Sequence, residues 1–206
     1  KILRVKPKII MSSPSKNILN LAENFLKKIG CETKIVEYDK SFTIETIRNI
    51  VLEEEAYLGI LYSSDGEKMS LTDGFNIVED DRYYMLTILM GFKTGSMKEA
   101  VIPYNFPRVM EKIAKEYKGK TIYSKSNISD IINTLIDRNI DFQYILNFDS
   151  IWATGKIIDY LIGNDITIEQ LRKDLPQYYY FKKEVPCRWD DKGKVIRILA
   201  EGRKEG

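Results

Sequence analysis

Short apolar runs alternate with segments of helical periodicity in the first 62 residues, and this alternation constrains the fold more than any other feature. The apolar run 9–11 ends in a Ser-Ser-Pro-Ser turn, and apolar residues then recur at helical spacing until Gly30. Further strands are predicted over 33–38 and 57–62, with a helix over 44–51 between them. Strands joined by helical crossovers form a parallel sheet covered on both faces. The predicted class is therefore α/β.

The rest of the chain indicates a second α/β unit. After an Asp73-Gly74 hairpin signal, which predicts an antiparallel edge, comes an apolar helix preceded by the acidic residues 79–81. This helix is predicted over 83–92. The alternation of strands and helices then begins again. Strands are predicted at 100–103, 121–124, 142–148 and 178–185, and helices at 107–117, 129–138, 150–162 and 190–206. Two consecutive units of similar topology suggest an internal structural repeat.

Composition narrows the range of partners. The chain has 206 residues, with 32 Lys plus Arg against 30 Asp plus Glu, a net charge of +2. Because positive and negative charges balance so closely, the chain has no strong electrostatic attraction for a phosphate backbone. Nucleic acid is therefore not a predicted partner. No apolar run approaches the roughly 18 residues of a spanning helix, so no membrane partner is predicted either. Cys31 and Cys187 form no disulfide or zinc pattern, which favours the cytoplasm.

The chain contains no histidine, and this absence excludes several kinds of catalysis. Ser-His-Asp and Cys-His nucleophile activation and HExxH metal sites all need imidazole. The glycine loops GxGxxG and GxxxxGK[ST] are also missing, so dinucleotide and P-loop phosphate sites are not indicated. Any catalysis by this chain must therefore use carboxylates, hydroxyls, lysines and tyrosines.

The stretch 62–68 is the most suggestive for function. It follows a buried predicted strand, at the sheet edge where open α/β proteins place ligand loops. Ser63, Asp65 and Glu67 alternate, so in an extended loop their oxygens face one side and suit a hard cation such as Mg²⁺. The alternative is a solvated hairpin.

Other motifs have both a functional and a structural interpretation. Hydroxyls of residues 12–15 precede a helix, where they either bind phosphate or cap the helix through Ser15. The acidic run 53–55 reads as a ligand patch or a solvated helix end, and the aromatic run 178–181 as a stacking surface or sheet packing. Cys187 has no activating partner in the sequence and is interpreted as inert.

Three motifs in order resemble the α-D-phosphohexomutases, the phosphoglucomutase and phosphomannomutase superfamily. Residues 56–68, AYLGILYSSDGEK, are similar to the family's metal loop, A-D-L-G-I-A-F-D-G-D-x-D-R. Residues 78–82, VEDDR, resemble a D-G-D-R/Q helix start. Residues 175–179, 184–187 and 192–196 resemble the end of the third of four domains.

The resemblance implies two tandem three-layer α/β/α domains with mixed, mostly parallel sheets. A second mutase-like domain is expected over 1–93, a third over 94–187 and a tail toward a fourth over 188–206. The family's three metal-binding aspartates align with Ser63, Asp65 and Glu67, and its following arginine, a substrate-binding position, with Lys68. Since one aspartate is intact, Mg²⁺ affinity is expected to fall. The family's sugar loop, G-E-x-S-G-H, has no counterpart between Phe142 and Asp149.

The expected function is a catalytically degenerate, regulatory or structural module of a longer sugar-nucleotide enzyme. The family's catalytic phosphoserine loop and phosphate-binding loop lie in its first and fourth domains, so no residue of this chain is assigned a catalytic role. The parent resembles a mannose-1-phosphate guanylyltransferase-like nucleotidyltransferase fusion, and the start at Lys1 and stop at Gly206 favour a fragment. Sugar phosphate and the remaining parent domains are the expected partners, with homo-oligomerisation left open. The alternatives are the middle domains of an active Mg²⁺-dependent mutase interconverting hexose 1- and 6-phosphates, or a generic α/β interaction domain.

Overall fold

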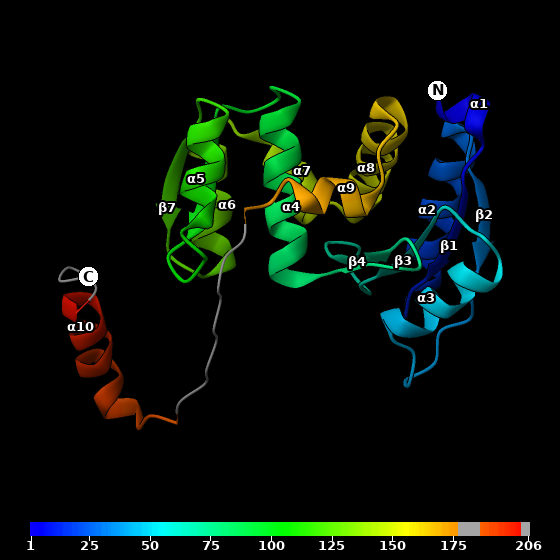
Figure 1. The fold of residues 1–206 in the computed structure, drawn as a ribbon. Helices are drawn as coiled ribbons and strands as arrows, with labels where there is room; N and C mark the ends of the chain where they lie inside the picture. Colours follow the sequence, from blue (N-terminus) through cyan, green and yellow to red (C-terminus); the bar gives the residue numbers. More distant parts are fainter. Residues whose placement is uncertain (177–185, 203–206) are drawn as a thin grey trace.

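A five-stranded mixed sheet forms the first half of the protein (Figure 1). The computed structural model describes residues 1–176 and 186–202. The strand order is β2-β1-β3-β4-β5. The parallel strands are β1 (Lys8–Ser12), β2 (Glu32–Ile35) and β3 (Leu58–Tyr62), and the antiparallel ones are β4 (Met69–Thr72) and β5 (Ile77–Val78). The predicted parallel sheet with an antiparallel edge is confirmed, although β2 ends earlier than expected.

Alternating side chains of β1 place helices on both faces of this sheet. Ile9 and Met11 belong to the larger core, on the face of α2 (Lys16–Ile29), whereas Ile10 packs with Ile47 of α3 (Ile44–Glu53). Gly30 ends α2 in the left-handed conformation, and Thr43 is the N-cap of α3. A short helix, α1 (Ile2–Val5), precedes β1.

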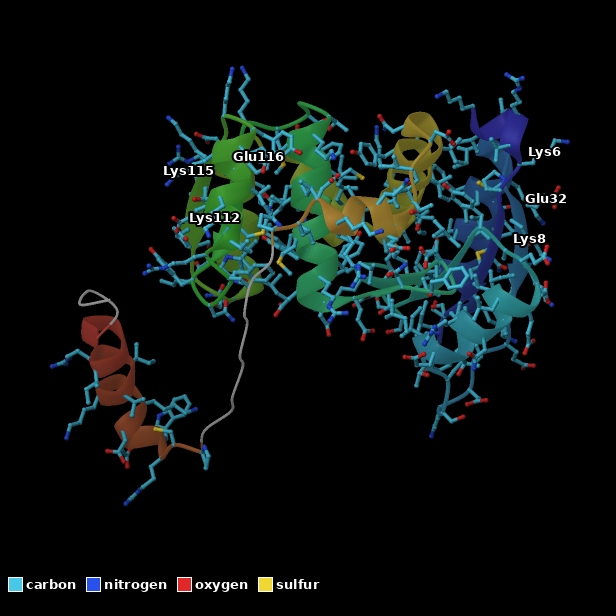
Figure 2. All side chains as sticks on the ribbon, in the orientation of Figure 1. Lys6, Lys8, Glu32, Lys112, Lys115 and Glu116 are labelled. Atoms are coloured by element: carbon cyan, nitrogen blue, oxygen red, sulfur yellow. The ribbon has the colours of Figure 1, made fainter. Side chains whose placement is uncertain are left out.

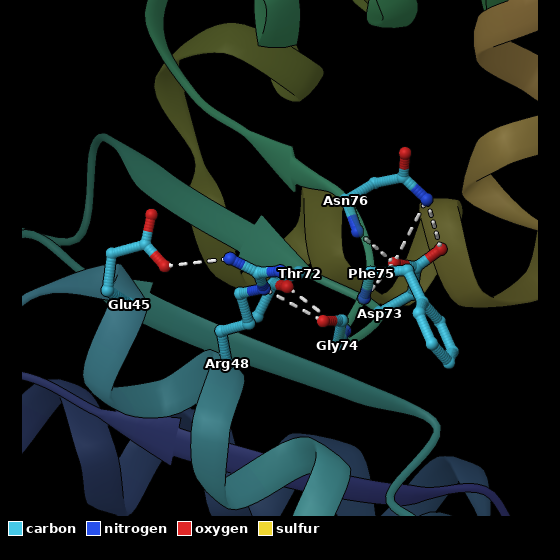
Figure 3. A network of polar contacts seen from close by, with 7 residues as sticks. All are labelled: Glu45, Arg48, Thr72, Asp73, Gly74, Phe75 and Asn76. Carbon is cyan, nitrogen blue, oxygen red and sulfur yellow. Dashed lines mark hydrogen bonds and ion pairs between the residues drawn. The ribbon is translucent and has the colours of Figure 1, made fainter.

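The turn between β4 and β5 is the hairpin that Asp73-Gly74 predicted. The Asp73 carboxylate accepts hydrogen bonds from the backbone N–H groups of Phe75 and Asn76, at 3.0 and 2.7 Å. Arg48 of α3 donates from Nε to the Gly74 carbonyl at 2.9 Å (Figure 3). The turn is therefore fixed to α3 as well as closed on itself.

The second half has a smaller sheet. After α4 (Asp80–Lys93), strands β6 (Glu99–Pro103) and β7 (Lys120–Ser124) pair in parallel. The crossover helix α5 (Val109–Glu116) connects them, and α6 (Ile128–Asp137) follows. These elements match the predicted strand-helix-strand-helix order.

The predicted strand over 142–148 is wrong, because this segment forms the helix α7 (Asp141–Phe148). Its Gln143 side chain takes the place that a third strand would occupy beside β6. Gln143 Oε1 accepts the Val101 N–H at 2.9 Å, and Nε2 donates to the Val101 carbonyl at 2.8 Å. Within the described residues the second sheet therefore has two strands, and the expected repeat of the first unit is incomplete.

Helix α8 (Ser150–Asn164) connects the two halves of the protein. It contacts α7 on one side and both α1 and α2 on the other, and α9 (Ile168–Lys173) follows it (Figure 1). One core cluster runs from Ile9 and Met11 through α4 to β6 and α8. The boundary expected near residue 93 remains a prediction, and the core is continuous across it.

The last described elements are a 3₁₀ turn, η1 (Trp189–Asp191), and α10 (Lys192–Gly202). A helix in this part was expected from the sequence. The strand predicted over 178–185 and the aromatic run 178–181 lie outside the described residues. No helix among the described residues has both the length and the apolar character needed to cross a membrane.

Candidate functional site

A cleft of about 780 Å³ lies at the carboxyl ends of β1 and β3. Pro14, Tyr62 and Ser63 line it from these strand ends, and Lys68 from the start of β4. The opposite wall comes from the first turns of α4, from Phe106 after β6 and from α7. The volume falls within the range of about 300 to 1,000 Å³ for small-molecule sites. Of the predicted site residues, Ser63 and Lys68 line this cleft, whereas Asp65 and Glu67 do not.

The loop between β3 and β4 is a tight turn whose polar groups bond to one another. Ser63 Oγ donates to the Asp65 carboxylate at 2.5 Å and accepts the Lys68 N–H at 3.0 Å. The same Asp65 oxygen accepts the Glu67 N–H at 3.0 Å. The hydrogen bond from Ser63, helped by that from Glu67, lowers the pKa of the Asp65 carboxyl. Asp65 is therefore charged at neutral pH and bonded within its own loop.

The tip of this turn is fixed to α2 and α8. Ser150, the first residue of α8, donates to the Gly66 carbonyl from both its N–H (3.0 Å) and its hydroxyl (2.6 Å). Gly66 has a φ of 75°, and a Cβ there would lie 2.8 Å from the Ile18 side chain. This close approach requires glycine at the tip of the loop.

The loop offers Mg²⁺ two carboxylates, Asp65 and Glu67, where the family pattern has three. A magnesium site in protein takes oxygen ligands, among them carboxylates that are free to coordinate. Here one Asp65 oxygen, Oδ1, already accepts the Ser63 hydroxyl and the Glu67 N–H. Among residues 1–176 and 186–202, no three acidic or thiol side chains are grouped so as to hold a metal ion. The metal site at Ser63, Asp65 and Glu67 stays a prediction of the resemblance.

Tyr62, Tyr83 and Tyr84 contribute to the cleft lining, and their hydroxyls are bonded within the protein. Tyr62 Oη lies 2.9 Å from Thr154 Oγ1 of α8, and Tyr83 donates to the Leu146 carbonyl. Tyr84 donates to the Val101 carbonyl at 2.9 Å and packs its ring on Phe106, with centroids 4.9 Å apart. Burial raises the pKa of all three phenols, which therefore stay protonated.

Charged groups face the cleft from two elements. Lys68 comes from the start of β4, whereas Asp80 and Asp81 form the first turn of α4. Asp80 has a φ of 48°, the left-handed region that few non-glycine residues adopt. Neighbouring Ser70 donates its hydroxyl proton to Glu79 at 3.2 Å. Elsewhere, cationic and anionic side chains are mixed, as with Lys112, Lys115 and Glu116 of α5 and with Lys6, Lys8 and Glu32 (Figure 2).

The serines before α2 serve the structure of the loop. Ser15 caps α2 by accepting the Ile18 N–H, and Ser13 Oγ accepts the Ser15 N–H at 3.1 Å and donates to the Ser63 carbonyl. Ser12 Oγ is fully buried and has no hydrogen-bond partner among the described residues. The structure therefore supports the capping interpretation of Ser15.

Two further candidates also have structural roles. In the acidic run 53–55, Glu54 pairs with Lys8 and Lys34 at the edge of the sheet. Burial raises the pKa of the Cys31 thiol to about 11, so this cysteine is a poor nucleophile. The Cys187 thiol contacts the carbonyl of the next residue, Arg188.

Comparison with known proteins points to the sugar-phosphate mutases. No protein-family model matches the chain. Phosphoglucosamine mutases from two strains of Histophilus somni, 2336 and 129Pt, are each 22% identical in a 164-residue alignment that covers 74% of this chain. A crystal structure of a phosphoglucomutase/phosphomannomutase family protein from Burkholderia thailandensis superposes with a TM-score of 0.62, at 18% identity over 82% of this chain.

The chain thus has the α/β fold of a phosphoglucomutase/phosphomannomutase family protein, and the sequence similarity supports a relationship with the phosphohexomutases. It spans 36% of the length of the curated relatives and 43% of the superposed structure. The comparison therefore shows a shared fold, and the activity of the longer proteins is said of those proteins alone.

Proposed function

We propose that this chain is a mutase-like module that binds a sugar ligand in the cleft and does not transfer phosphate. The module belongs, in this proposal, to a longer enzyme of sugar-phosphate or sugar-nucleotide metabolism, which carries the chemistry in other domains. A nucleotidyltransferase is the parent that the motif resemblance favours. Ligand binding in the cleft then acts as a regulatory or structural signal to those domains.

The observation that carries the proposal is the hydrogen bond between Ser63 and Asp65. Phosphoryl transfer needs the charge on the moving phosphate to be neutralised, which metal ions and fixed cations do in most enzymes. The Asp65 carboxylate instead accepts the Ser63 hydroxyl and the Glu67 N–H. Lys68 is the only cation of the described cleft lining. Such a cleft can hold a ligand but has little with which to stabilise a transferring phosphoryl group.

Metal titration of the 206-residue chain tests this proposal. Isothermal calorimetry with MgCl₂ is expected to give no saturable heat, in this chain and in the Asp65→Asn variant alike. The double variant Ser63→Asp, Glu67→Asp, which restores three aspartates, is the positive control and is expected to gain a binding isotherm.

Turnover of the longest natural chain completes the test. With hexose 1-phosphate and Mg²⁺ we expect no formation of hexose 6-phosphate above background. Mg²⁺-dependent interconversion that Asp65→Asn abolishes would contradict the proposal and favour an active mutase with an altered metal loop.

A further inference from the structure

We propose that the cleft selects an unphosphorylated, neutral sugar and discriminates against sugar phosphates. This inference rests on the proposed function, since it names the ligand of the same cleft. It follows from which polar groups of the cleft lining are left without partners.

Most polar atoms in the cleft wall already have hydrogen-bond partners. The hydroxyls of Tyr62, Tyr83 and Tyr84 point into the protein, and Ser63 and Ser70 donate to carboxylates. Asn147 bonds to the Gln143 carbonyl and to Thr87. These groups shape the wall and leave little hydrogen-bonding capacity for a ligand.

Three polar groups of the described lining have no polar partner within the described chain: the Asp80 and Asp81 carboxylates and the Tyr38 hydroxyl. A fourth, the Lys68 ammonium, has no hydrogen bond there but interacts electrostatically with Asp65. Together they offer acceptors (the carboxylates), donors (the ammonium) and one group that does both. A ligand that both donates and accepts at several positions matches this set, which is the chemistry of a sugar hydroxyl ring.

The aromatic wall suits the apolar faces of a sugar. Of the three tyrosines with inward hydroxyls, Tyr84 is partly exposed and offers ring carbon to the cleft, whereas Tyr62 and Tyr83 are buried beneath its wall. Phe106, packed on the Tyr84 ring, extends this surface. Ligand sites combine such apolar walls with a few convergent polar groups that set orientation. The cleft volume of about 780 Å³ accommodates a hexose.

Charge argues against a phosphate in this cleft. A phosphate monoester carries close to two negative charges at neutral pH and is bound by several cations or by a free helix N-terminus. The charges of the cleft lining are one ammonium, which also interacts with Asp65, against two carboxylates. Those carboxylates, Asp80 and Asp81, also occupy the first turn of α4 and so compensate the positive end of its dipole.

An organic cation would fit less well than a neutral sugar. Two carboxylates beside aromatic rings attract ammonium groups. Lys68 faces the same cleft, however, and would repel a second cation while its three donors went unused. A neutral polyhydroxyl ligand uses both the carboxylates and the ammonium.

Comparative calorimetry of the 206-residue chain tests this selectivity. Methyl α-D-glucopyranoside and methyl α-D-mannopyranoside are the neutral probes, with glucose 1-phosphate and mannose 1-phosphate as the charged ones. We expect at least one neutral glycoside to bind, and its phosphorylated counterpart to bind at least tenfold more weakly. The Asp81→Asn variant is expected to reduce the ratio of the two dissociation constants, phosphorylated to neutral sugar, at least threefold, because it removes one charge that repels phosphate.

Asp159→Asn is the matched control, since Asp159 is an exposed aspartate of α8 outside the cleft lining. It is expected to leave the ratio unchanged, and thermal melting of both variants checks that they fold. Equal or tighter binding of the phosphate esters, or tighter binding of tetramethylammonium than of either glycoside, would overturn the inference and leave the proposed function standing. Absence of binding by every sugar tested would overturn the proposed function itself.

Discussion

Two adjacent serines at the end of β1 have opposite roles in stability. The Ser12 hydroxyl is fully buried and has no partner in the part of the chain that the structure describes, whereas Ser13 is bonded to Ser15 and Ser63. A buried polar group without a hydrogen-bond partner destabilises the folded state, so removing that group stabilises the protein. Ser12→Ala should therefore raise the free energy of unfolding by about 1 kcal/mol, and Ser13→Ala should lower it by about 1 kcal/mol. Urea denaturation of both variants measures this, and a loss in Ser12→Ala would contradict it.

Gly66 is predicted to be intolerant of a side chain. Its φ of 75° and the close approach of Ile18 both oppose a Cβ. Gly66→Ala should lower the free energy of unfolding by about 1 to 3 kcal/mol. Gly163 of α8 has open space around a Cβ, so Gly163→Ala should raise it by about 0.5 kcal/mol. Chemical denaturation compares the two, and equal effects would show that the tip of the loop is not constrained.

The pKa of Asp65 tests the hydrogen bond on which the proposed function depends. The Ser63 hydroxyl is the largest cause lowering this pKa from its ordinary value of 3.8. A lowered pKa adds stability that is complete above the ordinary value and is lost as the pH falls through the lowered one. Ser63→Ala should thus raise the pKa of Asp65 toward 3.8. The variant should then lose less folding stability than the wild type as the pH falls. Carbon-detected NMR titration measures the change, and an unaltered pKa would refute the bond.

The residues of the cleft were only partly predictable. Their position after a buried strand was enough to place Ser63 and Lys68 at the sheet edge where α/β proteins bind ligands. The opposite wall, with Asp80, Asp81 and Tyr84, comes from a helix that local patterns describe only as acidic at its start and apolar beyond. Which residues face one another across the cleft depends on how α4 packs, and sequence spacing carries no signal for that.

Among the elements, α7 covers the free edge of β6 by a side-chain contact. The Gln143 amide pairs with both backbone groups of Val101, as a neighbouring strand would. Gln143→Leu keeps a similar side-chain volume but leaves the buried Val101 N–H without a partner and its carbonyl with the Tyr84 hydroxyl alone. It should lower the free energy of unfolding by about 1 to 3 kcal/mol. The Val101 amide should also exchange faster with deuterium in native conditions.

Tyr144→Phe on the same helix is the control for this change. Tyr144 is partly exposed and packs on the Phe148 ring. Its effect is expected to stay within about 0.5 kcal/mol. If Gln143→Leu is equally mild, or the Val101 amide stays protected, the amide does not replace a strand at this edge.

The same contact explains why the strand prediction for 142–148 is wrong. Aromatic and branched residues in FQYILNF favour a strand, and a short apolar run cannot by itself be distinguished from a buried helix. In the structure Gln143, Leu146 and Asn147 are buried, at helical spacing. Longer segments, such as the strongly periodic α2 and the apolar α8, were predicted in nearly their observed positions. The deciding partner, Val101, lies 42 residues away.

At the scale of the whole molecule, α8 links the first sheet to the second half of the chain. Thr154 bonds to Tyr62 across 92 residues, and Gly155 packs closely on Phe25 of α2. The cleft depends on the same arrangement, because its walls come from both halves. A ligand in the cleft therefore contacts both halves. These halves move together only if they fold as one cooperative unit.

We predict that residues 1–176 unfold in a single transition. Trp152 of α8 reports on the connection between the halves, in a Trp189→Phe background that removes the other tryptophan. Its fluorescence and the circular dichroism at 222 nm, followed during urea unfolding, should coincide, as expected for one cooperative unit. Thr154→Val, which leaves the buried Tyr62 hydroxyl unpaired, should lower the free energy of unfolding by about 1 to 3 kcal/mol and keep the two curves superimposed. Separate transitions would mean that domains divided near residue 93 fold independently, and that α8 only rests against the first sheet.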